Sequence, residues 1–193
     1  MTRPRLQTAT ALNSSSMKAI KPAVPLRELI ELSLMGAFMF GTQVAMSSLP
    51  NVNVVSVLII LTVIFYGAKA FYSVAVFVLL EGLLYGFGLW FISYLYIWAV
   101  LVSIALIFRK NKNSLIWAVI AGLFGLSFGL LCTLPYFFIG GFPMALSYWV
   151  SGIPFDVTHC ISNFVLTLLL IGPLRRLMQR LHPLSKSEGL SSL

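Results

Sequence analysis

The residues best suited to chemistry in this chain are three polar side chains in one hydrophobic segment near the C-terminus. Asp156, His159 and Asn163 follow one another at spacings of three and four within residues 152–170, which places them on one face of a helix. Pro154 suits the first turn of that helix, where a missing N–H costs nothing. Because polar groups inside a membrane-length apolar helix are costly, we expect them to face a cavity or a protein neighbour, and we interpret them as one wall of a ligand site.

A structural interpretation of the same three residues stays open. Asp156, near the expected start of the helix, would complement the helix dipole, while His159 and Asn163 would tie neighbouring helices together. Under that interpretation these side chains bind no ligand.

The composition sets the class of protein. The chain has 193 residues, of which 59% are hydrophobic and 9% are charged, and its mean hydropathy is +0.96. These values exclude a soluble globular domain and predict an all-α integral membrane protein. The two cysteines, Cys132 and Cys160, give neither a disulfide framework nor a metal-binding set. We therefore expect no metal and no cofactor.

Six apolar segments follow a polar, basic N-terminal stretch. We expect residues 1–25 to form a flexible cytoplasmic tail, residues 26–182 a membrane domain of six transmembrane helices, and residues 183–193 a second cytoplasmic tail. A short aromatic piece, residues 144–150, is expected to form an interfacial turn before the last helix. The six expected membrane segments are residues 26–48, 52–66, 70–85, 89–108, 115–138 and 152–170.

The positions of the charges predict the topology. The chain has thirteen Lys and Arg residues and a net charge of +8. Six crossings place all thirteen on one side, whereas the loops near Pro50, Gly88 and Gly140 carry none. By the positive-inside rule that side is cytoplasmic, so both termini are expected inside. The basic excess is thus a topology signal, and we expect no nucleic-acid partner.

The outer half of the membrane contains a second carboxylate, Glu81, which would be paired with His159 or a tyrosine if it is purely structural. No Lys or Arg is expected at this level, so Glu81 and Asp156 favour a neutral or cationic ligand over an anionic one. Aromatic residues crowd the same level, either as an outer aromatic belt or as stacking walls for a flat ligand. Those assigned to the site are Tyr85, Trp90, Tyr136 and Trp149.

Small residues recur in the first segment. Ala37, Gly41 and Ala45 are four residues apart, with Gly36 alongside. Such a small-residue stripe lets another helix lie close. The partner is either a helix of the same bundle or a second membrane protein.

One apparent catalytic motif lacks its structural context. The segment Gly125-Leu-Ser127-Phe-Gly129 matches the serine-hydrolase pattern, which requires a strand, a strained turn and a helix. Here it lies inside an apolar helix, so we predict a packing role and no enzyme. The disfavoured alternative is an intramembrane serine protease with His159 as base. The chain also contains no P-loop sequence.

Taken together, these features resemble a known family. The six segments, the small-residue stripe and a last segment reading Gly152-Ile-Pro-Phe-Asp156-x-x-His159-x-x-x-Asn163, closed by Pro173-Leu-Arg-Arg176, look like the substrate-binding S component of an energy-coupling factor (ECF) vitamin transporter. The resemblance extends over residues 26–181.

The resemblance implies a site, partners and a mechanism. Ala37, Gly41 and Ala45 would dock on the coupling membrane subunit, which two cytoplasmic ATPases drive; the family pattern has Ala where this chain has Gly41. The vitamin would bind in the outer half, under the loop that carries Asn51 and Asn53. The component would then topple in a bacterial plasma membrane and release the vitamin inside.

The resemblance leaves the ligand and the wider class open. A roomy, aromatic mouth with hydrogen-bonding groups would suit cobalamin, which is our single expectation. The alternatives are riboflavin, pantothenate, folate or a queuosine-type base. A stand-alone small transporter and a structural membrane protein without a ligand are the competing classes.

Overall fold

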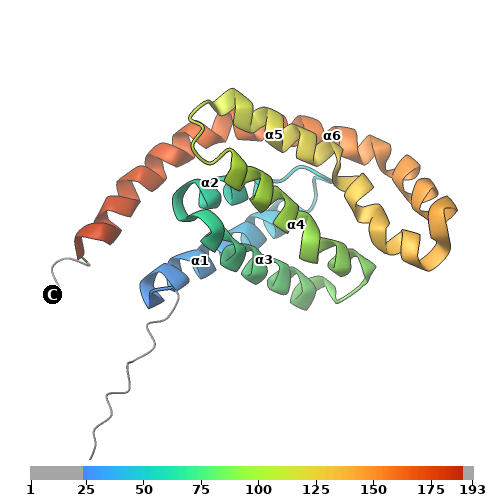
Figure 1. The fold of residues 1–193 in the computed structure, drawn as a ribbon, viewed down its shortest axis with the longest axis horizontal. Helices are drawn as coiled ribbons and strands as arrows, with labels where there is room; N and C mark the ends of the chain where they lie inside the picture. Colours follow the sequence, from blue (N-terminus) through green and yellow to red (C-terminus); the bar gives the residue numbers. More distant parts are fainter. Residues whose placement is uncertain (1–23, 189–193) are drawn as a thin grey trace, which may run out of the picture.

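The computed structural model describes residues 24–188, with side chains up to Leu181. The predicted N-terminal tail therefore lies almost entirely outside the described residues, whereas residues 183–188 of the predicted C-terminal tail continue α6. Over residues 24–188 the chain consists of helices and connecting loops, with no strand (Figure 1). The elements are α1 (Leu26–Ala45), α2 (Val55–Tyr66), the short η1 (Gly67–Lys69), α3 (Ala70–Tyr85), α4 (Leu89–Ile107), α5 (Ser114–Leu126) and α6 (Phe128–Glu188).

Helix α2 forms the centre of the bundle. All residues from Val55 to Val63 are buried, and α1, α3, α4 and α6 pack around them. A helix that is hydrophobic on every side must be surrounded by other elements. Its buried Thr62 remains satisfied because its hydroxyl donates to the Leu58 carbonyl at 2.7 Å. The central helix is therefore held by apolar packing.

The turn after α2 is fixed by a glycine and an arginine. Gly67 has a φ of 63°, a left-handed conformation that a side chain would disfavour. Arg109 lies against it and donates to the carbonyls of Ile64 and Phe65, both at 3.2 Å. An arginine at a helix C-terminus satisfies carbonyls that lack helical partners. The chain can therefore change direction between α2 and α3 without leaving those groups unpaired.

Helix α6 is a helical hairpin, and this corrects one prediction. Gly141, with a φ of 70°, separates a first arm (residues 128–140) from a second arm (residues 142–188). Residues 144–150 are helical, so the expected interfacial turn is wrong. The left-handed glycine makes the turn earlier, and Pro143 then occupies the first turn in place of Pro154.

The expected fifth segment also differs in detail. It is divided near Ser127 into α5 and the first arm of α6. The second arm then runs back along α5 (Figure 1). The last two expected segments therefore form an antiparallel pair whose first member is broken.

Several helices have the length and composition of membrane spans. Three stretches of the described chain are long and apolar enough to cross a bilayer: Val55–Tyr85, Leu89–Ile107 and Ser114–Leu181. The first and third contain the turns at Gly67 and Gly141. The prediction of an all-helical chain is confirmed for the described residues, and three of its helical stretches are long and apolar enough to span a membrane. The number of crossings and the side of the termini stay predictions.

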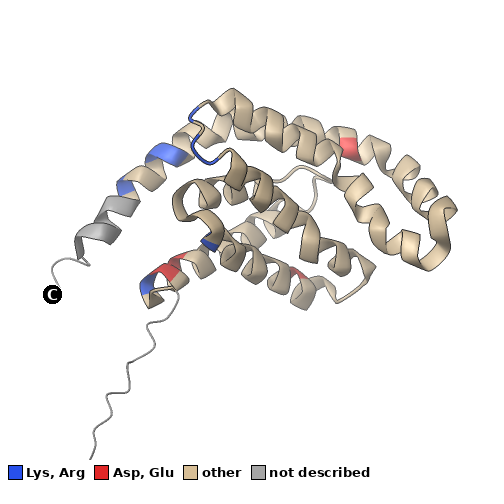
Figure 2. Ribbon diagram, in the orientation of Figure 1, with Lys and Arg blue, Asp and Glu red and all other residues tan. Residues whose placement is uncertain are grey.

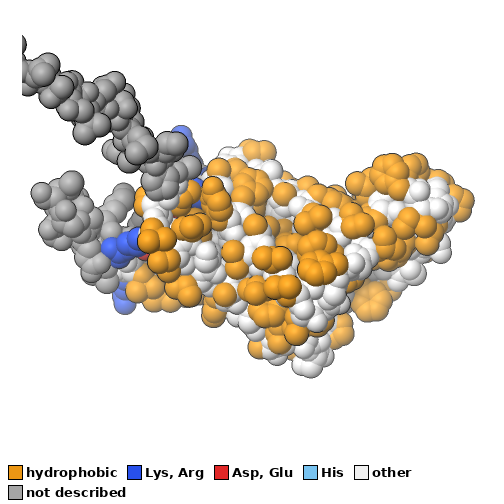
Figure 3. Space-filling model, turned by 90° about the horizontal axis from the view of Figure 1, so that it is seen from below, with side chains coloured by type: hydrophobic (Ala, Val, Ile, Leu, Met, Phe, Trp, Pro, Cys, Tyr) orange, Lys and Arg blue, Asp and Glu red, His pale blue; other side chains and the backbone are white. Residues whose placement is uncertain are grey.

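The surface agrees with a lipid environment. Large hydrophobic side chains spread over the face drawn in Figure 3, to an extent that water-soluble monomers rarely expose. The described Lys and Arg residues gather at one end of the molecule (Figure 2). The charge segregation expected from the sequence is thus also a segregation in space.

A pair of glycines on α1 tests the packing of that helix. A Cβ at Gly36 would overlap the Ser73 carbonyl oxygen and Val76 of α3, whereas a Cβ at Gly41 has nothing within 4 Å. Gly36→Ala should therefore lower the free energy of unfolding by roughly 1–3 kcal/mol through overpacking. Gly41→Ala should preserve or slightly raise it, because alanine favours a helix by about 1 kcal/mol. Thermal unfolding in detergent measures both, and equal losses would contradict the packing described.

Candidate functional site

The three polar residues of the last segment are buried, as expected. Asp156, His159 and Asn163 expose 5%, 3% and 1% of their surface. They lie on the side of α6 that faces α5 and the first arm, where Gly129 meets Asp156 and Gly125 meets His159. Neither glycine has room for a Cβ. The side chains thus face protein, and the absence of side chains opposite them allows the close approach.

Asp156 compensates for the break in the fifth segment. Its Oδ1 accepts a hydrogen bond of 2.8 Å from the Gly129 N–H. Gly129 lies in the first turn of α6, where N–H groups lack partners within the helix and negative charge is favoured. Asp156 therefore does complement a helix start, as the dipole interpretation expected, but this is not the start of the segment that carries Asp156. Asp156 lies well inside the second arm and complements the start of the first.

The same face of α6 carries polar atoms without partners. Ten buried side-chain atoms of the described residues have no hydrogen bond, and five of them lie on this face: Asp156 Oδ2, both ring nitrogens of His159, Asn163 Oδ1 and Thr167 Oγ1. The amide nitrogen of Asn163 does donate, to the Ala121 carbonyl at 3.3 Å. A buried polar group left unpaired costs about 1–3 kcal/mol. We call Asp156, His159, Asn163 and Thr167 the polar face of α6.

Sequence reasoning missed Thr167. It follows Asn163 by four residues, so helical spacing could have identified it. A threonine is common in membrane helices because its hydroxyl can bond to its own helix. Here that hydroxyl has no partner, which distinguishes it from the satisfied Thr62.

The loop between α1 and α2 reaches α6, but not through the expected side chains. Ser162 donates to the main-chain carbonyl of Asn51 at 2.7 Å. The Asn53 side chain accepts from the Val55 N–H at 3.1 Å and so begins α2. The loop lies beside the polar face, while the Asn53 amide is already used for capping.

The expected aromatic residues do not converge on one place. Tyr136 stacks on Tyr148 across the hairpin, with ring centroids 4.0 Å apart. Trp149 instead lines a groove of about 400 Å³ with Phe137 and other apolar residues. Tyr85 is 51% exposed. Trp149 and Tyr85 therefore fit an aromatic belt better than a ligand wall.

Glu81 lies in a second cluster. It exposes 2% of its surface and lies beside Gln43 and Tyr94. The Phe128 ring separates this cluster from the polar face, with its centroid 6.3 Å from Tyr94 and 4.9 Å from His159. The sequence placed Glu81 and Asp156 together. In the structure they belong to two clusters, and the Phe128 ring lies between these clusters. The expected alternative partner of Glu81, His159, is not its neighbour.

Ser127 has the surroundings of a packing residue. Its side chain is exposed, and its hydroxyl donates to the Leu123 carbonyl at 2.9 Å. His159, the base of the disfavoured protease alternative, is buried. The two glycines of the motif serve the close contact with α6.

The small-residue stripe of α1 lies on the surface. Ala37, Gly41 and Ala45 are exposed, whereas Gly36 packs against α3. Packing inside the bundle, one of the two alternatives, therefore applies to Gly36 and not to the stripe.

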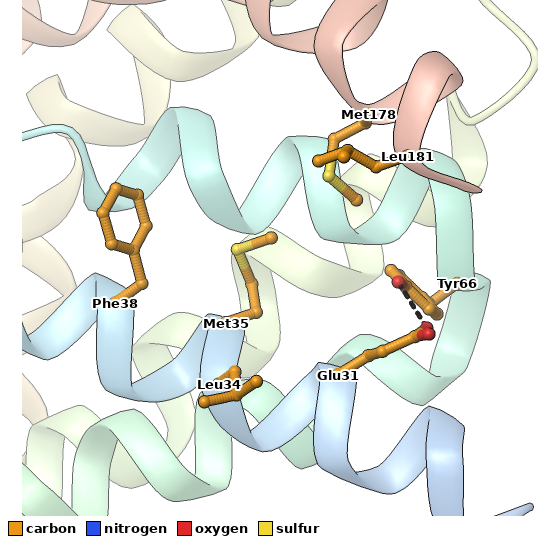
Figure 4. Close-up of a pocket in the computed structure, with 7 residues that line it drawn as sticks. All are labelled: Glu31, Leu34, Met35, Phe38, Tyr66, Met178 and Leu181. Atoms are coloured by element: carbon orange, nitrogen blue, oxygen red, sulfur yellow. Dashed lines mark hydrogen bonds between the residues drawn. The ribbon is translucent and has the colours of Figure 1, made fainter. Parts of the chain in front are cut away.

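A groove of about 300 Å³ lies elsewhere, between α1, the end of α2 and the second arm of α6 (Figure 4). Its polar pair is satisfied, because Tyr66 donates to Glu31 at 3.0 Å. The remaining walls are apolar: Leu34, Met35, Phe38, Met178 and Leu181. This groove contains none of the expected site residues.

Comparison with known proteins gives no relative. No family model, no curated protein and no solved structure matches the chain.

Two substitutions test the role of Asp156 in the fold. Asp156→Ala leaves the Gly129 N–H without its acceptor and should lower the free energy of unfolding by about 1–3 kcal/mol. Asp156→Asn keeps an oxygen for that N–H and should lose distinctly less. Thermal unfolding in detergent measures both, with Ser127→Ala as an exposed control. Equal losses for the two Asp156 variants would show that the hydrogen bond is not what matters.

Proposed function

We propose that this chain is the substrate-binding S component of an ECF-type vitamin importer. The observation that carries the proposal is the polar face of α6, with five buried atoms that lack hydrogen bonds. A bound solute with donors and acceptors would satisfy these groups. Solute binding thus gives the polar face a function that packing alone does not.

The proposed orientation rests on the basic residues. They gather at one end of the molecule (Figure 2), which we assign to the cytoplasm by the positive-inside rule. Glu81 lies twelve residues beyond Lys69 along α3, and Asp156 lies nineteen residues before Arg175 along α6. The ligand would then enter from outside a bacterial plasma membrane and leave toward the cytoplasm when the component topples.

The small-residue stripe supports a membrane partner. Ala37, Gly41 and Ala45 are exposed on α1, and a smooth helix face permits close, reversible helix contact in lipid. We assign it to the coupling membrane subunit, which would work with two cytoplasmic ATPases. A stand-alone transporter would need no such surface, and it is the second candidate only because no partner is identified.

The ligand is proposed as a neutral or cationic water-soluble vitamin. The polar face combines a carboxylate, an imidazole, an amide and a hydroxyl, a set suited to a solute with many hydrogen-bonding groups. Cobalamin is the first candidate on sequence grounds, with riboflavin and a queuosine-type base as alternatives. Pantothenate and folate are further alternatives, but their carboxylates make them anionic, so the charge preference disfavours them. Binding and release, without catalysis, are the proposed activity.

Native mass spectrometry tests the binding function. The protein, purified alone in mild detergent from cells grown on rich medium, should carry a small molecule of vitamin mass. Asp156→Asn replaces the unpaired acceptor by an NH₂ donor, so affinity should fall at least about tenfold. Ser127→Ala should retain the ligand. Equal ligand retention by Asp156→Asn would show that the polar face is not part of the site. A protein that carries no small molecule and does not copurify with ATPases would favour the structural class.

Uptake by whole cells tests the docking surface. Gly41→Leu adds a bulky side chain to the small-residue stripe, so uptake of the bound vitamin should be abolished while binding to the purified protein is unchanged. Gly41→Ala keeps the surface small and is the matched control. Normal uptake by Gly41→Leu would refute docking at this face.

A further inference from the structure

The Glu81 cluster has too many acceptors for its donors. Glu81 of α3, Gln43 of α1 and Tyr94 of α4 meet at one place. The Gln43 amide nitrogen lies 3.4 Å from the Tyr94 hydroxyl oxygen. Two further oxygen atoms of the cluster, Glu81 Oε1 and Gln43 Oε1, are buried and have no hydrogen bond among the described residues. This site therefore contains two unpaired hydrogen-bond acceptors, one from α3 and one from α1.

No described cation is available to supply them. The described Lys and Arg residues gather at one end of the molecule (Figure 2), and Lys69 lies twelve residues before Glu81, at the opposite end of α3. The described ion pairs, Lys69 with Glu28 and Arg27 with Glu31, use other carboxylates. His159 is separated from Tyr94 by the Phe128 ring. Gln43 is the hydrogen-bonding neighbour of Glu81, and Glu81 Oε1 is left without a partner. A buried carboxylate without a cationic partner is costly, so a cation from outside the chain would be favoured here.

Aromatic rings complete the walls. Tyr94 has ring neighbours at centroid distances of 5.1 Å for Trp90, 5.5 Å for Trp98 and 6.4 Å for Phe77. Aromatic rings around a carboxylate exclude water and attract organic cations through their π electrons. Tyr85, in the last turn of α3, is half exposed, so the cluster lies one helical turn from the surface.

We propose that Glu81, Gln43 and Tyr94 form a subsite for the ammonium group of an organic cation. An ammonium offers three N–H donors, which match Glu81 Oε1, Gln43 Oε1 and a lone pair of the Tyr94 hydroxyl. Hard metal ions such as Ca²⁺ and Mg²⁺ take six or more oxygen ligands, and these three side chains supply too few. The organic part of the cation would lie against the aromatic walls.

This inference deepens the proposed function, and it rests on that function only in assigning the ammonium to the transported solute. The Phe128 ring lies between the subsite and the polar face, so a ligand that contacts both would have to displace that ring. The inference selects a cationic ligand from the neutral and cationic ones considered. Cobalamin, with its neutral amide side chains, would then give way to an amine-bearing vitamin.

A thermal-shift experiment tests the subsite directly. Protein whose mass spectrum is that of the polypeptide alone is heated with 2-phenylethylammonium chloride, and separately with 2-phenylethanol or sodium chloride at the same concentration. The ammonium compound should raise Tm by roughly 5 °C near saturation, and the other two should not. Glu81→Gln and Gln43→Leu should each remove most of the shift. Glu28→Gln, which changes a carboxylate at the basic end, should keep it.

The outcomes separate the two proposals. A shift that survives in Glu81→Gln and Gln43→Leu, or an equal shift with 2-phenylethanol, overturns the ammonium subsite. An equal Glu81-dependent shift with sodium chloride overturns it in favour of an alkali ion. No shift from any compound, in protein that still binds a vitamin in an Asp156-dependent way, overturns the subsite and leaves the proposed function standing. A shift that depends on Glu81, in protein without vitamin or ATPase partners, supports the subsite and counts against the importer.

Discussion

The second arm of α6 approaches the first arm so closely that Gly129 has no room for a side chain. That contact brings the Asp156 carboxylate to the N–H groups at the start of α6, beside the break at Ser127. A carboxylate buried between apolar helices loses its hydration, which is unfavourable unless other groups bind it. A helix start offers both free N–H donors and a favourable dipole. The rest of the polar face follows Asp156 along the same helix, and α5 covers it by a second close approach at Gly125.

The sequence predicted the helices well where apolar runs end at strong turn signals. Helices α3 and α4 agree with the expected segments to within one residue, because Gly67, Gly86 and the basic loop after α4 interrupt apolar runs. The start of the last helix was wrong because Gly152 and Pro154 are usual helix-boundary residues. Gly141 already supplies the left-handed turn, and the helix then continues through both residues within the hairpin.

The sequence predicted that the polar residues of the last segment are buried, but not which other side chains lie beside them. Hydrophobic spacing places Asp156, His159 and Asn163 on one face, and the structure confirms that they are buried together. Spacing along single helices carries no information on which helices become neighbours. The sequence therefore joined Glu81 to the polar face, whereas packing inserts the Phe128 ring between them. For the same reason the expected aromatic residues divided between the hairpin and the outer surface.

A comparison within this chain separates structural polar groups from those of the polar face. Ser73 joins α3 to α1 by donating to the Leu32 carbonyl at 2.8 Å, and Ser162 joins α6 to the loop before α2. Both hold elements together with a completed hydrogen bond.

The polar face instead leaves five buried atoms unpaired. Each unpaired atom costs about 1–3 kcal/mol, against a total stability of about 5–15 kcal/mol for a typical domain. Apolar side chains of similar size would avoid that cost, so helix association alone is a poor reason for a carboxylate, an imidazole and an amide on one buried face. A solute that completes their hydrogen bonds accounts for them better.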